Sequence, residues 1–508
     1  MIVKLKNIGI KGNVLMLINN FLFTRNIKLN INGVTGDIRQ CAEYGLPQGS
    51  VLSPVLFKIF LMDFLTEFKN RPDIDLYKFA DDGTVKVKAS NSQSAIDILN
   101  YILQCLQAWT RRWRMKVNCD KNKTEIICFN TAEGNKELIP KTFKLGDEDI
   151  DRVAQTKVLG LTIDEDLTYI PHSQEILKSL NGRWATLCKY SNCHWGFSQT
   201  VMLHLVKTLF LSKLSYASHI WITTENIKEI NKLWYHILKS ITGAVLNISM
   251  NVAELILGVP PILIQNKINS VKHFLKVNNR PVQNDRYKEF LQLTYNEAAK
   301  SPSVIHNKYK DTFKFLEWKV YRHPSHFNID DLNIVNNKRY NSFTDLSEKA
   351  CTYSKDMITR YTESLWQSTI RNQFQIDGYP TPPIASCDSV PVPQNTPRKI
   401  EVALISMFYK NNILNQSLYK LSKVESPKCS FCSQHEETAE HLLFKCIAVE
   451  EQLRTNAYRN YRLANNLQDN DVSPDSYIAL LNASKHKPFI SSCIEILKNL
   501  NLKVTVDL

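Results

Sequence analysis

The chain has 508 residues, of which 44% are hydrophobic and 10% aromatic, and its formal net charge is +14. This length and composition exclude both a single small domain and a wholly disordered chain, and they predict two to four domains. The excess of Lys and Arg favours a polyanionic partner such as nucleic acid over a basic protein without such a partner.

The N-terminal stretch, residues 1–23, is apolar enough to be compared with a leader or a membrane span. Its most apolar part, residues 14–23, is interrupted by Asn19 and Asn20, and no small-residue cleavage site follows it. We therefore expect a buried amphipathic helix near 13–24, with no signal peptide and no membrane segment. The protein should be intracellular, in the nucleus, the cytoplasm or both.

Residues 27–31 alternate between apolar and polar side chains, and Asn32-Gly33 follows them. This pattern predicts a hairpin whose second strand begins after the turn. After a glycine-containing segment at 45–53, the apolar positions of 54–68 recur at helical spacing and predict a helix.

Two further alternating segments, 74–80 and 84–88, flank Asp81-Asp82-Gly83. They predict a hairpin with both carboxylates at its tip. Paired carboxylates can hold the two divalent ions that nucleotidyl transfer uses. An Asp-Asp-Gly tripeptide by itself, however, is more often only a good turn.

The remaining elements of the N-terminal third are a helix at 93–113 and strands at 123–129 and 157–163. The first 165 residues should therefore fold as an α+β layer with an antiparallel sheet. From about 170 to 370 the pattern is helical, with long amphipathic stretches at 198–221 and 226–245. The proline-rich segment 379–397 predicts an extended linker before a final helical segment.

The motif GLPQGSVLSPVLF at residues 45–57 is followed by Met62-Asp63 and then by Phe79-Ala-Asp-Asp82. The combination resembles reverse transcriptases, and more narrowly those of non-LTR (LINE-type) retrotransposons. The resemblance extends through Lys121-Asn-Lys-Thr-Glu125 and Val158-Leu-Gly-Leu161 into the helical segment at 209–221.

The resemblance implies a function for several residues of the N-terminal third. Asp81, with Asp82 beside it, would be the catalytic Mg²⁺ ligand, and Leu159-Gly160 would form the primer grip. Lys123 would lie near the nucleotide phosphates, although a surface lysine at the edge of a strand is nearly as good an interpretation. The remaining substrate-binding positions would be Gly45, Pro47, Gln48, Gly49, Ser50 and Phe79.

The resemblance also implies a division of the chain into five segments. These are a partial palm (1–165), a helical thumb (166–260), a helical connector (261–378), the proline-rich linker (379–399) and a C-terminal helical module (400–508). The family's palm begins with another aspartate on an earlier strand, whereas the first acidic residue here is Asp37. We therefore expect a truncated or degenerate copy, or a start that lies upstream, and little polymerase activity from this chain alone.

Cys429, Cys432, His441 and Cys446 have the spacing Cys-x2-Cys-x8-His-x4-Cys. In a reduced protein this spacing predicts a tetrahedral Zn²⁺ knuckle, which many LINE-type proteins carry after the polymerase. His435 is a competing ligand, and the alternative is that Cys446 and His441 only pack a helix. The knuckle would contact nucleic acid or stabilise the terminal module.

The sequence therefore predicts an RNA-directed DNA polymerase that uses Mg²⁺, an RNA template, a DNA primer and deoxynucleoside triphosphates. The alternative is a catalytically inactive, nucleic-acid-binding remnant. A zinc hydrolase fits poorly, because four protein ligands leave no open position for water.

Overall fold

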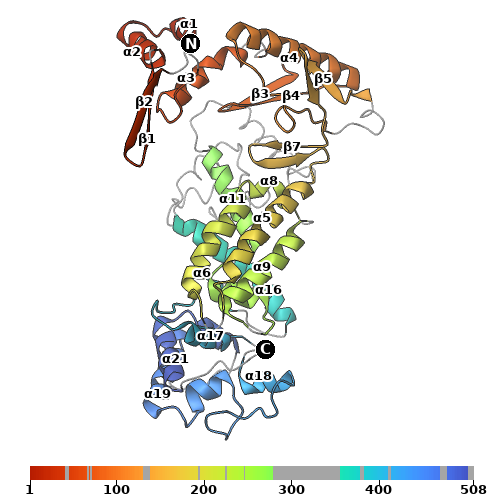
Figure 1. Ribbon diagram of the computed structural model, residues 1–508. Coiled ribbons are helices and arrows are strands. Elements are labelled where there is room, and N and C mark those ends of the chain that lie inside the picture. Colours follow the sequence, from red (N-terminus) through yellow and green to blue (C-terminus); the bar gives the residue numbers. More distant parts are fainter. Residues whose placement is uncertain are drawn as a thin grey trace, which may run out of the picture. The chain divides into compact units, whose positions relative to one another are not determined.

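The computed structural model divides into two compact units, Met1–Thr168 and Tyr169–Leu508 (Figure 1). The first unit mixes helices and strands, and the described part of the second is helical. The structure describes residues 1–23, 25–40, 45–65, 68, 71–129, 138–192, 195–223, 226–244, 246–278, 355–377, 383–409, 413–468 and 477–500.

The described helices of the first unit are α1 (Ile2–Asn7), α2 (Gly12–Leu22), α3 (Ser53–Phe60), α4 (Ser92–Trp113) and the short 3-10 helix η1 (Met62–Leu65). Its described strands are β1 (Asn26–Ile31), β2 (Val34–Gln40), β3 (Ile74–Phe79), β4 (Asp82–Val87), β5 (Thr142–Leu145), β6 (Glu148–Asp151), β7 (Gln155–Val158) and β8 (Leu161–Asp164). They pair in sequence order into four separate two-stranded antiparallel sheets. The α+β class and the antiparallel pairing are confirmed, but the single sheet that we expected is replaced by four hairpins.

Two of the predicted strands are wrong. Residues 123–129 form a single β-bridge, from Ile126 to Arg152. Two backbone hydrogen bonds, between Ile126 and residues 151 and 153, make this bridge, and they are too few for a strand. Residues 157–163 are a hairpin rather than one strand. Leu159 and Gly160 take positive φ angles of 49° and 82°, which reverse the chain between β7 and β8.

Three helix predictions are confirmed with different bounds or burial. The helix expected near 13–24 is α2, but only Ile18 and Leu22 of it are buried. The helix expected at 54–68 is shorter than predicted, because α3 ends at Phe60 and the 3-10 helix η1 follows it. The side chains of Lys4 and Lys78 hydrogen-bond to the carbonyls of Phe60 and Leu61, where the helix ends. The helix expected at 93–113 is α4, which Asn91 caps by accepting a hydrogen bond from the Ser94 N–H.

Small apolar clusters hold the first unit together, and α4 connects two of them. Ile102 packs with Phe68 and Ile74 of the segment that leads into the β3–β4 hairpin. The neighbouring Leu103 packs with residues of β5 and β6. A third cluster joins α1, α2 and α3 through Leu5, Ile18, Leu22 and Leu56. The position of the β3–β4 hairpin in this unit is therefore set by α4.

The second unit begins with α5 (Ile170–Cys188), α6 (Gln199–Val206), the π-helical turn η3 (Lys207–Leu211), α7 (Ser212–Ser215), α8 (Ser218–Trp221), α9 (Ile227–Thr242), α10 (Met250–Leu257) and α11 (Ile262–Asn278). It continues with α16 (Lys355–Ile376), α17 (Arg398–Ser406), α18 (Asn415–Lys420), the π-helical turn η5 (His441–Lys445), α19 (Glu451–Ala464), α20 (Tyr477–Ala483) and α21 (Lys487–Asn499). The predicted helical pattern is confirmed where it is described, and 279–354 lies outside the described residues. None of the helices in the described ranges has the length and apolarity to cross a membrane.

The proline-rich segment has no helix or strand at 383–397, and it is packed against its neighbours. The Val390 N–H donates to the Ile256 carbonyl, and the Ala385 N–H donates to Gln367. The Lys485 ammonium, which is nearly buried, donates to the carbonyls of Ile256 and Asp388. This part of the chain has no regular secondary structure, and these hydrogen bonds hold it against α10 and α16. Residues 378–382 lie outside the described part.

Candidate metal centres and nucleotide-binding turn

The β3–β4 hairpin presents two adjacent carboxylates. Its strands pair from Ile74 with Val87 to Phe79 with Asp82, which leaves Ala80 and Asp81 as the two turn residues. Ala80 takes a positive φ of 51°, and Asp82 begins β4. The predicted position of both carboxylates at a hairpin tip is confirmed.

Asp81 and Asp82 are exposed, and within the described ranges neither carboxylate has an ion-pair or hydrogen-bond partner. Two free carboxylates on a tight turn are a donor set suited to a hard divalent cation such as Mg²⁺. Phe79, which pairs with Asp82 in register, is also exposed. The geometry therefore fits a metal-binding tip with an aromatic ring beside it.

Lys78 anchors this hairpin, a role that the sequence analysis missed. Its ammonium donates a hydrogen bond to the Leu61 carbonyl and lies 4.9 Å from the centre of the Phe64 ring. Burial lowers the pKa of Lys78 to about 8. The contact ties β3 to the junction between α3 and η1, so the carboxylate tip is connected to the helix that follows the glycine-containing turn.

Asp63, which the sequence analysis used only as part of a motif, has hydrogen-bond partners within the first unit. It accepts hydrogen bonds from Lys4 at 2.7 Å and from the Trp109 indole N–H at 3.0 Å. Burial alone would raise the pKa of Asp63, but these hydrogen bonds outweigh it and hold the pKa below its usual value. The Lys4 ammonium also lies 3.7 Å from the centre of the Trp113 ring. This group therefore joins α1, η1 and α4 and does not supply a free metal ligand.

The turn before α3 has the backbone that its glycines predict. Gly45 and Gly49 have φ angles of 79° and 86°, which side chains rarely allow. The Pro47 carbonyl accepts a hydrogen bond from the Ser53 hydroxyl at 2.7 Å, which closes the turn onto the first residue of α3. Gln48 is exposed and makes no hydrogen bond to either carboxylate of the β3–β4 hairpin. The turn is therefore preformed, and the side chain of Gln48 is available to a ligand.

Lys123 and the Leu159-Gly160 turn are described as well. Lys123 is exposed and lies in a turn closed by its own N–H and the Asp120 carbonyl, so it is not at the edge of a strand. Leu159 is exposed at the tip of the β7–β8 hairpin. The functions expected for both positions stay predictions.

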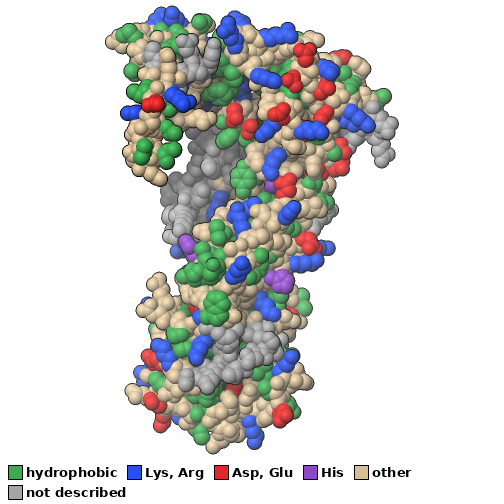
Figure 2. All heavy atoms as spheres, viewed as in Figure 1, with side chains coloured by type: hydrophobic (Ala, Val, Ile, Leu, Met, Phe, Trp, Pro, Cys, Tyr) green, Lys and Arg blue, Asp and Glu red, His purple; other side chains and the backbone are tan. Residues whose placement is uncertain are grey.

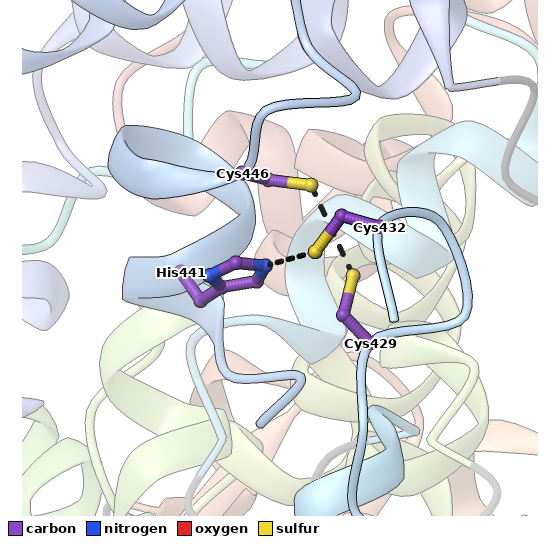
Figure 3. A group of neighbouring side chains, drawn as sticks. All are labelled: Cys429, Cys432, His441 and Cys446. Atoms are coloured by element: carbon purple, nitrogen blue, oxygen red, sulfur yellow. Dashed lines mark hydrogen bonds between the residues drawn. The ribbon is translucent and has the colours of Figure 1, made fainter. Parts of the chain in front are cut away.

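The second unit brings the four predicted Cys and His residues together (Figure 3). Their ligand atoms all lie within 4.8 Å of one another. The Cys432 sulfur is 3.2 Å from the His441 Nε2, and the sulfurs of Cys429 and Cys446 are 3.9 Å apart. This is the only such group found in the part of the chain that the structure describes, and His435 is not a member of it. The predicted ligand set, rather than the competing histidine, is therefore assembled.

Burial and nearby backbone groups shift the pKa values of these four residues. Burial raises the pKa of Cys429 to about 12 and raises that of Cys446. At Cys432, hydrogen bonds from the backbone of Gln434 and His435 outweigh burial and lower the pKa. Burial also lowers the pKa of His441. Four converging donors, two of them in fully buried cysteines, are what a tetrahedral Zn²⁺ ion would neutralise.

Glu437 fixes the loop that carries the first two cysteines of the group, a contact that the sequence analysis also missed. Its buried carboxylate accepts hydrogen bonds from the Ser430 N–H at 2.7 Å and from the Asn415 N–H at 3.2 Å. The first contact fixes the loop between the two cysteines, and the second fixes the start of α18. No periodicity in the sequence marks such a contact.

A family model and several known proteins each resemble part of this chain. Residues 2–163 match the family model described as reverse transcriptase (RNA-dependent DNA polymerase). The RNA-directed DNA polymerase from mobile element jockey of Drosophila melanogaster is 24% identical over 45% of this chain and 25% of its own length. The Pol polyprotein from type-1 retrotransposable element R1 of Bradysia coprophila is 27% identical over 44% and 22%. A probable RNA-directed DNA polymerase from transposon BS of Drosophila melanogaster is 29% identical over 39% and 22%.

This chain thus spans at most a quarter of the length of these three relatives. Together, the family match, the carboxylate hairpin and the glycine turn before α3 agree with one another. Residues 2–163 are a reverse transcriptase domain, related to those of the RNA-directed DNA polymerases of non-LTR (LINE-type) retrotransposons.

Proposed function

We propose that this chain takes part in RNA-directed DNA synthesis by a LINE-type element. It would extend a DNA primer along an RNA template with deoxynucleoside triphosphates and Mg²⁺. The observation that carries the proposal is the pair of free carboxylates at the tip of the β3–β4 hairpin, inside the matched reverse transcriptase domain. The names of the relatives point to the same activity.

In this proposal Asp81 and Asp82 hold the divalent ions. Bound Mg²⁺ would assist attack by the primer 3′ hydroxyl and stabilise the departing pyrophosphate. The tight turn keeps the two anions adjacent, which is costly without a cation and favourable with one. Lys78 keeps the tip in place through its bond to the Leu61 carbonyl. Further ligands would complete the coordination.

The turn at residues 45–53 would seat the template and the incoming nucleotide. Positive φ angles at Gly45 and Gly49 bring bare backbone to the surface, and Gln48 offers both a donor and an acceptor. The side chains of Ser50 and Phe79 border the same site in this proposal, and Lys123 contacts phosphate. Leu159 and Gly160 would position the primer from the β7–β8 hairpin.

Zn²⁺ would be held by Cys429, Cys432, His441 and Cys446. We propose that its main role is to stabilise the terminal module. Two of the cysteines are fully buried, and the adjoining Phe444 packs on Tyr461 of α19 and Phe489 of α21. Loss of the ion would leave buried sulfurs without the partner that orders the loop.

Manganese binding tests the carboxylate hairpin without depending on turnover. Mn²⁺ replaces Mg²⁺ at oxygen sites, and its free form is measured by electron paramagnetic resonance. The zinc-loaded chain should bind Mn²⁺ in competition with Mg²⁺, and Asp81→Ala should abolish this binding. Asp147→Ala is the matched control, because Asp147 is an exposed aspartate in the turn of the β5–β6 hairpin.

Equal Mn²⁺ binding by Asp81→Ala and the parent chain would refute the metal site. If a primer–template hybrid still bound with a steep salt dependence, nucleic-acid binding without catalysis would become the better function. Loss of both kinds of binding in a folded sample would refute the proposed function as a whole.

A further inference from the structure

The loop between α5 and α6 exposes three large aromatic side chains close together in sequence. Tyr190, Trp195 and Phe197 are 45%, 59% and 37% exposed. The rings of Tyr190 and Phe197 are stacked, with centroids 5.2 Å apart and planes 25° from parallel. The Phe197 N–H donates to the Tyr190 carbonyl at 2.9 Å, which fixes the two residues relative to each other. Tyr190 and Phe197 therefore offer a preformed pair of stacked rings to solvent, and Trp195, two residues before Phe197, is exposed as well.

The core of the same unit does not need these rings. It buries other aromatic residues completely, among them Trp221, Trp234 and Phe210. Leaving three large aromatic rings partly in water forgoes the hydrophobic gain of burying them, and such exposed clusters usually mark an interaction surface. The question is what kind of partner covers them.

The charge around the loop favours a polyanion. Residues 176–224 contain no Asp or Glu, and they contain Lys178, Arg183, Lys189, Lys207 and Lys213. Lys189 and Lys207 are exposed. Glu401, which reaches the start of α6 from α17, is buried and paired with Arg398, so its charge is compensated. Over α5 and α6, Lys and Arg side chains lie beside hydrophobic ones in Figure 2.

Aromatic rings interleaved with cations suit a nucleic-acid strand whose bases are unpaired. Every base has a flat face that stacks on an aromatic ring, whereas a duplex keeps those faces covered. A protein partner of matching charge would need acidic side chains, and it would bury these rings without needing their flat faces, whereas an unpaired base uses both the face and the charge. The observations therefore favour a single strand over a duplex or a protein.

We propose that the α5–α6 loop binds unpaired bases of a single-stranded nucleic acid by stacking on Tyr190, Trp195 and Phe197, with Lys189 contacting a neighbouring phosphate. The site rests on the proposed function only in requiring a nucleic-acid partner. It is independent of Asp81 and of metal. Its function would be to hold a template or primer strand where that strand is not paired.

Binding of the full chain to a labelled uridine oligonucleotide, measured by fluorescence anisotropy at several salt concentrations, tests this site. A strand of equal length built from abasic units carries the same phosphates without bases and should bind more weakly. Trp195→Ala should weaken uridine binding about 5- to 150-fold and leave the salt dependence unchanged. Trp195→Phe should restore most of the affinity, because phenylalanine still offers a ring face.

Lys189→Gln should act differently. It should lower the slope of log affinity against log salt by about 0.7, the value for one phosphate contact on a single strand. Tyr419→Ala is the matched control, because Tyr419 of α18 is 49% exposed in the same unit but lies outside the loop. It should change neither affinity nor slope.

Equal affinity for the abasic strand, or an unchanged affinity in both Trp195→Ala and Tyr190→Ala, would overturn the stacking site. If the same chain still bound Mn²⁺ through Asp81, the proposed polymerase function would stand without it. Stronger binding of duplex than of single strand, together with sensitivity to Trp195→Ala, would also contradict the proposal.

Discussion

The buried ion pair between Arg398 and Glu401 should be one of the most sensitive points of the second unit. The two side chains are 2.7 Å apart and only 4% and 2% exposed. The Glu401 carboxylate also accepts two hydrogen bonds of 3.0 Å from the Gln199 N–H at the start of α6. Arg398 donates to the carbonyl of Ile241 near the end of α9 at 2.8 Å. One pair therefore connects α17 to the ends of two other helices.

We predict that Glu401→Ala lowers the free energy of unfolding by about 3–5 kcal/mol, because it leaves a buried guanidinium without its counter-charge. The lost acceptor at Gln199 adds to this cost. A domain is typically stable by only about 5–15 kcal/mol, so the loss should be plain in urea unfolding followed by circular dichroism.

The exposed pair Glu229–Lys232 provides a control of equal geometry. It has the same i,i+3 spacing and the same 2.7 Å separation, but its side chains are 59% and 70% exposed. Glu229→Ala should cost less than about 1 kcal/mol, because water screens the charges. Similar losses in the two variants would refute the reasoning that burial, rather than pairing, sets the cost.

Two further predictions concern the second unit. The purified chain should contain Zn²⁺ by elemental analysis, and the Cys446→Ser variant should lose the ion and unfold at a lower urea concentration. The Cys493→Ser variant should keep the ion, because Cys493 is a buried cysteine outside the group. Equal zinc contents in the two variants would contradict the assigned ligands. Burial raises the pKa of Glu254 to about 8, so folding favours the protonated form of this side chain. The free energy of unfolding should therefore fall as the pH rises from about 4.3 to 8, by at most about 1.4 kcal/mol per pH unit. Glu254→Gln should remove this share of the pH dependence while keeping an acceptor for the Trp234 indole N–H, and an unchanged pH profile would show that Glu254 is not the titrating group.

Local patterns in the sequence predicted the local parts of this structure. The alternation around Asp81-Asp82 and the spacing of Cys429, Cys432, His441 and Cys446 were sufficient, because each site is built from residues close in sequence. Periodicity failed where the outcome depended on distant partners. Residues 123–129 look like a strand but find only two backbone hydrogen bonds to residues 151–153.

The same limit explains the missed anchors. Lys78 is bound to the Leu61 carbonyl, and Glu401 is bound to Gln199, 202 residues away in sequence. Neither contact leaves a repeating pattern in the sequence, since a charged residue with a distant partner looks like any surface charge until that partner is known. The same limit applies to the proline-rich segment, which its composition predicts to be a linker. Its backbone hydrogen bonds to Ile256 and Gln367 depend on helices that composition does not reveal.

We propose above that the β3–β4 hairpin holds a divalent ion beside the end of a primer. Iron-mediated cleavage tests it most directly, because Fe²⁺ at an Mg²⁺ site generates hydroxyl radicals that cut whatever lies nearest. With a primer–template hybrid bound to the full chain, we expect cuts in the polypeptide around Ala80–Gly83 and cuts in the DNA strand at the primer 3′ end. Both sets of cuts should disappear in Asp81→Ala and persist in Asp147→Ala. Cuts that lie elsewhere, or that persist in Asp81→Ala, would contradict the account.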